Sequence, residues 1–467
     1  MATQASAEVA ASDEGGLKRT ITGRLLFFYV LGDVLGSGIY VLIGAVAGEV
    51  GGAFWMAFAS GMAVATVTGL AYAELVTKYP RAAGASLFIN KAFGSPALTF
   101  FVTVCILSAL FAASGSLASG FATYFAPIWD WPPALLVTIV FILLLTVVNF
   151  IGITESVVAN MVMTFIEVAG LVLVVVIGIV FVLRGDADFG TLVEFDSPDS
   201  PVLAVVAGVS LAFFAMTGFE NTANVAEETI EPAKCYPRAL IGGMLAAGVI
   251  YVLVAMSAAL VVDTETLGKS AEGTGTNAAL LEVIKADVIS IPVLLFAAIA
   301  LVAITNTTLV GIVTQPRILY GMAREDVVPG VFAKLHSKRR SPVAGLLFCA
   351  AVVIGLLVAG SVLGQLGLSV DLVSRLASVT VLFLLFIYTL VIIAALRLSG
   401  RDETEETFRA PRALLVLGLL GNVAIFAYSI YDDWRSLLWC AALLAIGLAL
   451  FIVEKIFGKR DGGEALL

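Results

Sequence analysis

Twelve long apolar runs dominate the sequence, and each is long enough to cross a lipid bilayer as a helix. In hydrocarbon every backbone polar group must be satisfied within the chain, so such runs fold as membrane-spanning helices. Charged residues make up 13% of the 467 residues, against about 25% in a soluble protein. We therefore predict an all-α membrane protein with twelve transmembrane helices, at residues 21–49, 53–77, 97–126, 134–152, 156–183, 201–226, 239–262, 289–316, 343–363, 370–396, 412–431 and 435–457.

These spans are predicted to form one transmembrane domain, residues 21–457, between tails at 1–20 and 458–467. The first tail is polar and lacks a signal-peptide cleavage site, so we expect it to be retained. Lysine and arginine gather in the loops on the N-terminal side of the membrane. The other side keeps only Arg184, Lys269, Lys285 and Arg435. This bias predicts a multi-pass protein of the cell membrane with both termini in the cytoplasm.

Several classes of function find no support in the sequence. The single histidine, His336, lies in a basic loop, and the four cysteines are scattered, so neither a catalytic cluster nor a metal framework is indicated. No glycine loop of the ATP-binding type is present. A channel would show repeated pore loops or a ring of charge, and we find neither. We expect no enzyme activity, no bound cofactor and no nucleic-acid partner, in a monomer or homodimer that contacts the lipid bilayer and a small-molecule substrate.

Two of the predicted spans are interrupted by glycine-containing segments. Gly36-Ser37-Gly38 lies in the middle of the first span, and residues 213–220 lie in the sixth. Glycine makes unwinding cheap, and interruptions at matching places in two halves of a membrane chain point to a substrate site. We predict that residues 35–38 and 215–219 are non-helical and face each other at the membrane midplane. The alternative is that the glycines only allow close helix packing.

Unwinding of the first span would expose backbone groups of both signs. The N–H groups that open its second half, at Ser37, Gly38 and Ile39, would carry the positive end of a helix dipole and suit a carboxylate. The C=O groups that close its first half, at Val34 and Leu35, would suit an ammonium group or a cation.

The sixth span repeats this arrangement. It offers carbonyls at Phe214 and Thr217, and free N–H groups near Gly218 and Phe219. A ligand that uses both breaks needs a negative and a positive group a few ångströms apart. An α-amino acid meets this requirement.

Four motifs occur in the order and spacing of a known family, and the resemblance covers roughly residues 20–460. They are 36–40 (GSGIY), 72–75 with 79–84, 214–220 with 226–229, and 317–325. In these motifs the chain resembles the amino acid–polyamine–organocation superfamily, whose signature at the first is GSGIF or GTGIF. The resemblance implies amino acid transport by alternating access. It also implies five-plus-five inverted repeats with broken helices 1 and 6, repeat one at 21–184 and repeat two at 200–398, followed by two extra helices at 412–457.

The resemblance also implies roles for residues at both breaks. The N–H groups of Ser37 and Gly38 would hold the substrate carboxylate. The carbonyls of Val34, Phe214 and Thr217 would hold its amine. Phe214 matches an aromatic residue that closes over the substrate, and Glu220 matches an acidic position that we interpret as a gate. The full expected substrate site is Val34, Gly36, Ser37, Gly38, Ile39, Phe214, Ala215, Thr217 and Gly218.

Glu167, in the fifth span, is the first candidate for ion or proton coupling. Many proton-coupled relatives have a lysine at this point, in the place where sodium-coupled relatives bind a cation. This chain has a carboxylate instead, so the lysine mechanism cannot carry over. By analogy with that cation site, Glu167 would face oxygen atoms that suit sodium, namely the carbonyls of Gly32 and Leu35 and the hydroxyls of Thr307 and Thr308. A proton on the carboxylate is the other way to neutralise it.

Two alternatives remain open for these carboxylates. Glu167 could simply pair with Asn160 or a hydroxyl at a polar helix interface. Asp33, just before the first break, is the second coupling candidate because ionisable residues within spans are functional by default. For Asp33 the alternative is an ion pair with an arginine on the cytoplasmic side.

The residues expected around the substrate side chain are apolar, namely Leu110, Ala113, Met216, Phe219 and Ile304. No basic residue lies near the breaks, since Arg375 falls close to the outer end of the tenth span. We therefore predict a secondary transporter of neutral amino acids, hydrophobic or small, coupled to protons or sodium. The alternatives are a permease for polyamines, ethanolamine or another organic cation, or an amino acid exchanger on the same fold.

Overall fold

The computed structural model describes residues 21–80, 84–129, 131–151, 157–195, 200–269, 278–324, 328–336, 341–366 and 371–457. Across these ranges the regular structure is helical, apart from one isolated bridge between Ile21 and Thr229. Eleven helices are long and apolar enough to cross a membrane, or twelve if a bent pair counts as one span. The all-α membrane fold is therefore confirmed. The two predicted tails lie outside the described residues.

The spanning elements follow the predicted order. They are α2 (Gly23–Leu35) with α3 (Gly38–Val50), α4 (Trp55–Lys78), α6 (Pro96–Phe125), α7 (Ala134–Ile151), α8 (Val157–Arg184), α9 (Pro201–Ala215) with η3 (Phe219–Glu228), α10 (Pro232–Val261), α13 (Val293–Arg324), α14 (Val343–Gln365), α15 (Leu372–Leu398), α16 (Arg412–Asp432) and α17 (Ser436–Phe457). The assignment of these elements to two inverted repeats stays a prediction.

Two helices extend well beyond their predicted bounds. Helix α10 begins at Pro232 rather than 239, and α13 ends at Arg324 rather than 316. The α10 extension contains an internal proline, Pro237, and the α13 extension begins immediately after another, Pro316; both extensions contain charged residues. Hydropathy ends a span where polar residues begin, but helical hydrogen bonding continues through the polar surface layer of the membrane, so the predicted bounds were wrong there.

Short helical elements connect the spans, and the search for long apolar runs missed them. They are η1 (Gly52–Phe54), α5 (Gly84–Phe93), η2 (Phe189–Val193), α11 (Thr264–Lys269), α12 (Ala279–Lys285) and η4 (Gly330–Ala333). Helix α5 packs against α15, α6 and η3, so it closes one end of the bundle rather than crossing it. We call the face of the domain at which α2 begins the N-face, and the face at which α3 ends the opposite face.

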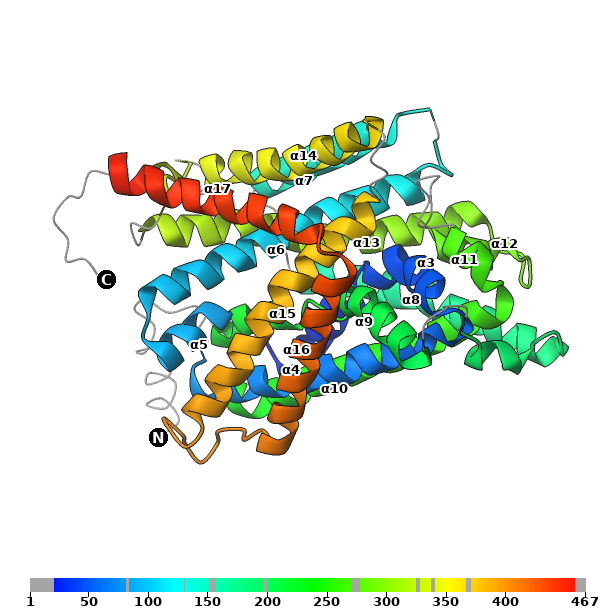
Figure 1. The fold of residues 1–467 in the computed structure, drawn as a ribbon, viewed down its shortest axis with the longest axis horizontal. Helices are drawn as coiled ribbons and strands as arrows, with labels where there is room; N and C mark the ends of the chain where they lie inside the picture. Colours follow the sequence, from blue (N-terminus) through cyan, green and yellow to red (C-terminus); the bar gives the residue numbers. More distant parts are fainter. Residues whose placement is uncertain are drawn as a thin grey trace, which may run out of the picture.

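The broken spans lie at the centre of the helix bundle. Helix α2 packs against α10 and α8, while α3 packs against α9 and α11. Helices α10 and α4 run side by side along one edge, and α7 and α14 lie together along another (Figure 1). Helix α17 packs against α15 and α6, and α16 packs against α15, α4 and α9. The interior of the fold is therefore built around the two interruptions.

A buried polar network fixes the N-face end of α4. The Lys78 ammonium group lies 2.8 Å from the Glu74 carboxylate and donates a hydrogen bond of 3.0 Å to the carbonyl of Leu398. The second carboxylate oxygen of Glu74 accepts a hydrogen bond from the backbone N–H of Ala410 at 3.0 Å. Both side chains are buried, so pairing is what makes their charges tolerable there. The network ties α4 to the connection between α15 and α16.

Candidate functional site

The first span is interrupted where the sequence predicts. Helix α2 ends at Leu35 and α3 begins at Gly38, and the two axes are bent by 40°. The interruption is narrower than expected, because only Gly36 and Ser37 fall between the helices. Leu35 and Gly38 keep helical geometry, so the expected non-helical stretch 35–38 was too long by one residue at each end.

The second interruption has a different form. Helix α9 ends at Ala215, and the chain resumes at Phe219 as the tighter 3₁₀ helix η3. Gly218, between them, has φ of 113°, a conformation that favours glycine. Ala215 and Phe219 themselves are helical, so this stretch was also predicted too long. The break itself is confirmed.

The two breaks contact each other directly, as predicted. A Cβ atom added to Gly38 would lie 2.5 Å from the Cα atom of Ala215, and one added to Gly218 would lie 2.5 Å from the carbonyl oxygen of Asp33. No side chain fits at either position without moving backbone. The glycines therefore allow both the interruptions and the close packing of the two spans. The packing role that was the alternative is present in addition to the break.

Tyr251 of α10 joins the carbonyl ends of the two broken spans. Its hydroxyl lies 2.5 Å from the carbonyl oxygen of Val34 and 3.1 Å from that of Ala215. Its ring packs edge-to-face on Phe58, with 5.9 Å between centroids, and the side chain is fully buried. A hydroxyl has a single hydrogen, so it satisfies the two carbonyls by sharing or alternation. Sequence reasoning missed this residue, whose only signal was a tyrosine in the middle of an apolar span.

The backbone N–H groups at the breaks also have partners within the chain. The N–H of Ser37 donates to the Thr307 hydroxyl at 3.1 Å, and the N–H of Gly218 donates to the Glu220 carboxylate at 2.8 Å. The hydroxyl of Thr217 donates to the carbonyl of Phe214 at 2.7 Å. A ligand at the breaks would therefore replace partners that the chain supplies.

Glu220 links the second break to an aromatic cluster on its N-face side. The oxygen that accepts from Gly218 also accepts from the Tyr388 hydroxyl at 2.7 Å. The ring of Tyr388 packs against Phe219 and Tyr72, with centroids 5.2 and 6.0 Å apart. All three rings are fully buried. They pack as one cluster beside Glu220, whose expected gate role stays a prediction.

A wide vestibule opens on the opposite face. It has a volume of about 1290 Å³ and extends down to Ala45 of α3 and Ser210 of α9. Ala45 lies about two helical turns beyond Gly38. Arg375 lines this vestibule and is paired with Asp433, far along the chain from either break. The vestibule thus approaches the breaks from one side only.

Glu167 of α8 is fully buried behind the first break. One carboxylate oxygen accepts a hydrogen bond of 2.9 Å from the Asn306 side-chain amide. The other, Oε2, is buried with no hydrogen-bond partner among the described residues. A buried carboxylate oxygen without a donor is costly. The binding of a proton or a cation to this carboxylate stays a prediction.

The neighbours of Glu167 differ in part from those predicted. Asn306, which sequence reasoning missed, faces Glu167, while Thr307 donates to the carbonyl of Ala303 and accepts from Ser37. Thr308 donates to the carbonyl of Ile304 at 2.7 Å. Each residue along a helix turns by about 100°, so Asn306 and Thr307 point toward different neighbours. Neither threonine hydroxyl is hydrogen-bonded to Glu167 among the described residues, and their shared ligation of an ion stays a prediction.

The end of α2 does lie beside the Glu167 helix. A Cβ on Gly32 would come within 2.0 Å of the Thr164 hydroxyl, one turn before Glu167 on α8. The Asp33 carboxylate, buried on α2, is near enough to interact electrostatically with Glu167. Ligation by the carbonyls of Gly32 and Leu35 stays a prediction, and the side chain of Asn160 lies outside the described residues.

Tyr40 fastens α3 to the same region. Its hydroxyl donates to the backbone carbonyl of Glu167 at 2.8 Å, and its own carbonyl accepts from the Tyr124 hydroxyl at 2.8 Å. Tyr40 occupies the last position of the GSGIY motif, where the resembled family has phenylalanine. This departure from the family pattern was the signal for a polar link, and its meaning was not recognised from the sequence.

Comparisons with known proteins show which family and which fold this chain resembles. A family model described as amino acid permease matches residues 23–456. A branched-chain amino acid permease, BcaP, of Bacillus subtilis is 23% identical over 95% of this chain and 94% of its own length. A chloroplastic cationic amino acid transporter of Arabidopsis thaliana is 26% identical over 66% of this chain, which spans only 55% of that relative. The crystal structure of a manganese transporter mutant of Eremococcus coleocola matches 96% of this chain and 98% of its own, with a TM-score of 0.61 and 14% identity, and shares its fold.

The contact between Gly38 and Ala215 leads to a stability prediction. Gly38→Ala should force the two broken spans apart, because the added methyl group meets backbone at 2.5 Å. We expect a loss of about 1–3 kcal/mol, as for other overpacked sites. The apparent melting temperature of the purified protein in detergent measures it. Gly355→Ala on α14 is the matched control, since its Cβ meets nothing within 4 Å. Equal melting temperatures for the two variants would contradict the close approach.

Tyr251→Phe should destabilise the junction of the breaks, because it removes the hydroxyl shared by two buried carbonyls. Groups left unsatisfied in this way cost about 1–3 kcal/mol each. Tyr236→Phe on the same helix is the control, because that hydroxyl contacts the Thr222 side chain at 2.7 Å and no break carbonyl. Hydrogen exchange in the peptides that contain Val34 and Ala215 should accelerate in the first variant only. Unchanged exchange in these peptides would show that Tyr251 does not hold the junction.

Proposed function

The chain belongs to the amino acid permease family, and from this premise we propose that it is a secondary active transporter of neutral amino acids, hydrophobic or small, that works by alternating access. One observation carries the proposal. Two interrupted spans meet at the centre of the bundle, and the carbonyl and N–H groups that the interruptions release from helical hydrogen bonding bind only exchangeable side-chain partners there.

The backbone groups at the breaks match an α-amino acid. The N–H of Ser37 at the start of α3 suits the substrate carboxylate, since it donates here to a neutral hydroxyl that a charged oxygen would outcompete. The carbonyl of Val34 suits the substrate ammonium group, which would replace the single hydrogen of Tyr251. The expected roles of Gly36, Gly38 and Thr217 belong to the same proposal.

The surroundings of the breaks favour a neutral side chain. Met216, Phe219 and Ile304 are fully buried and apolar. An anionic substrate side chain would need a cationic partner there, since unpaired charges in such surroundings are very costly. The carboxylates of Asp33 and Glu220 lie at the second break instead. The similarity to a branched-chain amino acid permease supports a hydrophobic substrate.

The two sides of the breaks support alternating access. The vestibule approaches them from the opposite face and ends about two helical turns from the first break, while Tyr72, Phe219 and Tyr388 pack together on the N-face side. With both termini in the cytoplasm, as the distribution of basic residues favours, this arrangement admits substrate from outside the cell. Release on the other side requires the aromatic cluster to part, and Glu220 is well placed to control it.

We assign the coupling ion or proton to Glu167. Its free oxygen Oε2 is buried beside α2, and the nearby Asp33 carboxylate adds a second negative charge. A proton or a sodium ion would remove one of these two negative charges and would join α8 to α2. Because the ion would bind best in the conformation that brings these helices together, it would shift the equilibrium between the two access states.

One observation favours the alternative of an organic-cation permease. The vestibule is lined by more acidic than basic residues, with Glu49, Asp371, Asp432 and Asp433 against Arg375. Such a field raises the local concentration of cations. The Arabidopsis relative is named as a cationic amino acid transporter. An exchanger on the same fold differs from a symporter only in its kinetics.

Uptake into proteoliposomes tests the proposed substrate class. We expect leucine, isoleucine, valine or alanine to accumulate, and lysine, putrescine and ethanolamine to be excluded. The panel is run with and without a sodium gradient, a pH gradient and substrate loaded inside. Uptake confined to the cationic compounds would replace the proposal by its alternative, and uptake that requires internal substrate would identify an exchanger.

Glu167→Gln tests the coupling site. The amide mimics a protonated carboxylate and leaves the Asn306 contact an oxygen acceptor, so substrate binding should persist. We expect accumulation against a gradient to be lost, while exchange between equal concentrations continues. Glu282→Gln is the control, because this carboxylate pairs with Lys285 at the surface. If Glu167→Gln still concentrates substrate with unchanged pH and sodium dependence, Glu167 is structural and Asp33 becomes the candidate.

A further inference from the structure

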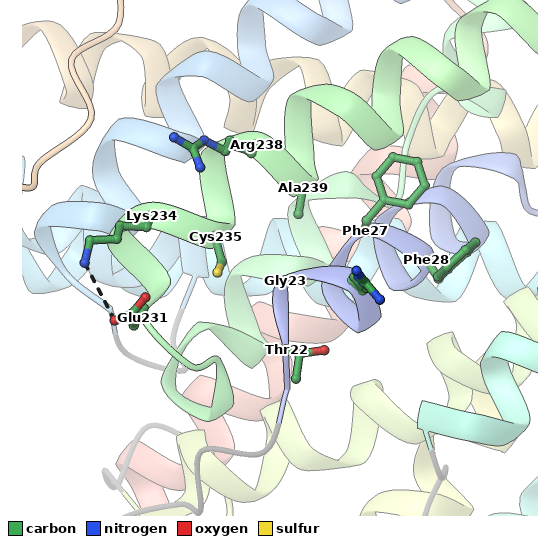
Figure 2. Close-up of a pocket in the computed structure, with 10 residues that line it drawn as sticks. Thr22, Gly23, Phe27, Phe28, Glu231, Lys234, Cys235, Arg238 and Ala239 are labelled. Carbon is green, nitrogen blue, oxygen red and sulfur yellow. Dashed lines mark ion pairs between the residues drawn. The ribbon is translucent and has the colours of Figure 1, made fainter.

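A second hollow lies at the N-face, outside the site at the breaks. It has a volume of about 830 Å³ and is formed by the starts of α2 and α10. Figure 2 shows Thr22, Phe27 and Phe28 on α2, across from Lys234 and Arg238 on α10. The two helices touch at its base, where a Cβ on Gly23 would lie 3.0 Å from the sulfur of Cys235.

The lining of this hollow has an excess of positive charge. Arg24, Lys234 and Arg238 face one acidic residue, Glu231. Glu231 lies 3.6 Å from Lys234, as the dashed line in Figure 2 marks. Arg24 and Arg238 are exposed and form no ion pair with any residue that the structure describes. Two guanidinium groups are therefore available to an anion.

The hollow opens onto the lipid-facing surface rather than toward the breaks. Arg238 shares a face of α10 with Leu245 and Val249, seven and eleven residues further on, whose side chains are 52% and 60% exposed. These exposed apolar residues mark the side of α10 that contacts acyl chains. Arg238 continues that side at the end of the helix, where a bilayer has its headgroups.

The apolar wall of the hollow continues into the same surface. Phe27 and Phe28 are partly exposed, and the ring of Phe28 lies 5.2 Å from that of Phe165 on α8. Phe165 is 52% exposed. A ligand in the hollow would thus meet cationic groups at one end and a lipid-facing aromatic surface at the other.

We propose that this hollow binds an anionic phospholipid, with its phosphate between Arg24 and Arg238 and its acyl chains along Phe28, Phe165 and Leu245. Basic pockets between spanning helices are suited to such headgroups. A soluble phosphate would use the arginines but not the apolar wall, and a zwitterionic lipid would bring its own cation toward them. The combination therefore selects a lipid with net negative charge.

Such a lipid would connect the helices that form the junction of the breaks. Helix α2 ends at the first break, and α10 carries Tyr251, which holds both break carbonyls. A headgroup bound to Arg24 and Arg238 would restrain these two helices at the membrane surface. The binding itself does not depend on the transport activity proposed above, so the two ideas can fail separately.

Lipid binding by the full-length protein tests the proposal. The delipidated protein in detergent is titrated with phosphatidylglycerol or phosphatidylcholine, and bound lipid is counted by native mass spectrometry. We expect phosphatidylglycerol to bind and to raise the melting temperature, and phosphatidylcholine to bind at least tenfold more weakly. Arg24→Gln with Arg238→Gln should remove this preference. Lys455→Gln on α17 is the control, because it removes one exposed cation from a helix that packs on α15 and α6.

Further variants keep the test decisive. Arg24→Lys with Arg238→Lys conserves the charge and should keep most of the preference, which separates loss of binding from loss of fold. Inorganic phosphate at the same concentrations should not stabilise the protein. The proposal is overturned if the double glutamine variant binds phosphatidylglycerol as the unmodified protein does, or if inorganic phosphate stabilises equally well.

Discussion

The structure depends on one constraint, which is that a helix interrupted inside a membrane must find partners for the backbone groups it frees. The chain meets this constraint partly within the second broken span, where Glu220 accepts from the N–H of Gly218, and partly with side chains from unbroken helices. Tyr251 of α10 serves the carbonyls of Val34 and Ala215, and Thr307 of α13 serves the N–H of Ser37. The breaks are thus polar points where several helices are joined, rather than isolated defects in two spans.

A hydrogen-bond partner that comes from another helix can be exchanged for a group of a ligand at little cost in free energy. A hydrogen bond replaced by an equivalent one leaves no buried group unsatisfied, whereas one simply broken costs about 1–3 kcal/mol. A zwitterion at the breaks would offer N–H donors and carboxylate acceptors in place of Tyr251 and Thr307. Tyr251 would then be released from Val34 and Ala215, and Thr307 would be released from Ser37. Substrate binding would therefore change how α10 and α13 are held, and this is the link that alternating access requires.

The sequence was sufficient for features that depend on the chain's local chemistry. Hydropathy located the spans, and the glycines around Ser37 and Gly218 located the breaks, because no other residue fits where two backbones approach so closely. It was insufficient for partners supplied from distant helices. Asn306 and Tyr251 carry no local signal, since their roles depend on how α13 and α10 are rotated against α8 and α2. The side chain that donates to Glu167 is therefore Asn306 rather than its neighbours Thr307 or Thr308, because a shift of one residue turns a side chain by about 100°.

That rotation also connects the proposed ion site with the proposed substrate site. Asn306 contacts the carboxylate of Glu167, and the next residue, Thr307, contacts the N–H of Ser37 at the first break. A proton or cation on Glu167 changes what Asn306 must satisfy, and any resulting turn of α13 moves the Thr307 hydroxyl. On the other side, Tyr40 fixes α3 to the backbone carbonyl of Glu167 itself. One link from Glu167 runs through Asn306 and Thr307, and the other runs through Tyr40. Because α3 begins at the first break, both links lead to the groups proposed to hold the substrate carboxylate. Coupling between ion and substrate would then need no long-range pathway, only the rigidity of one helical turn.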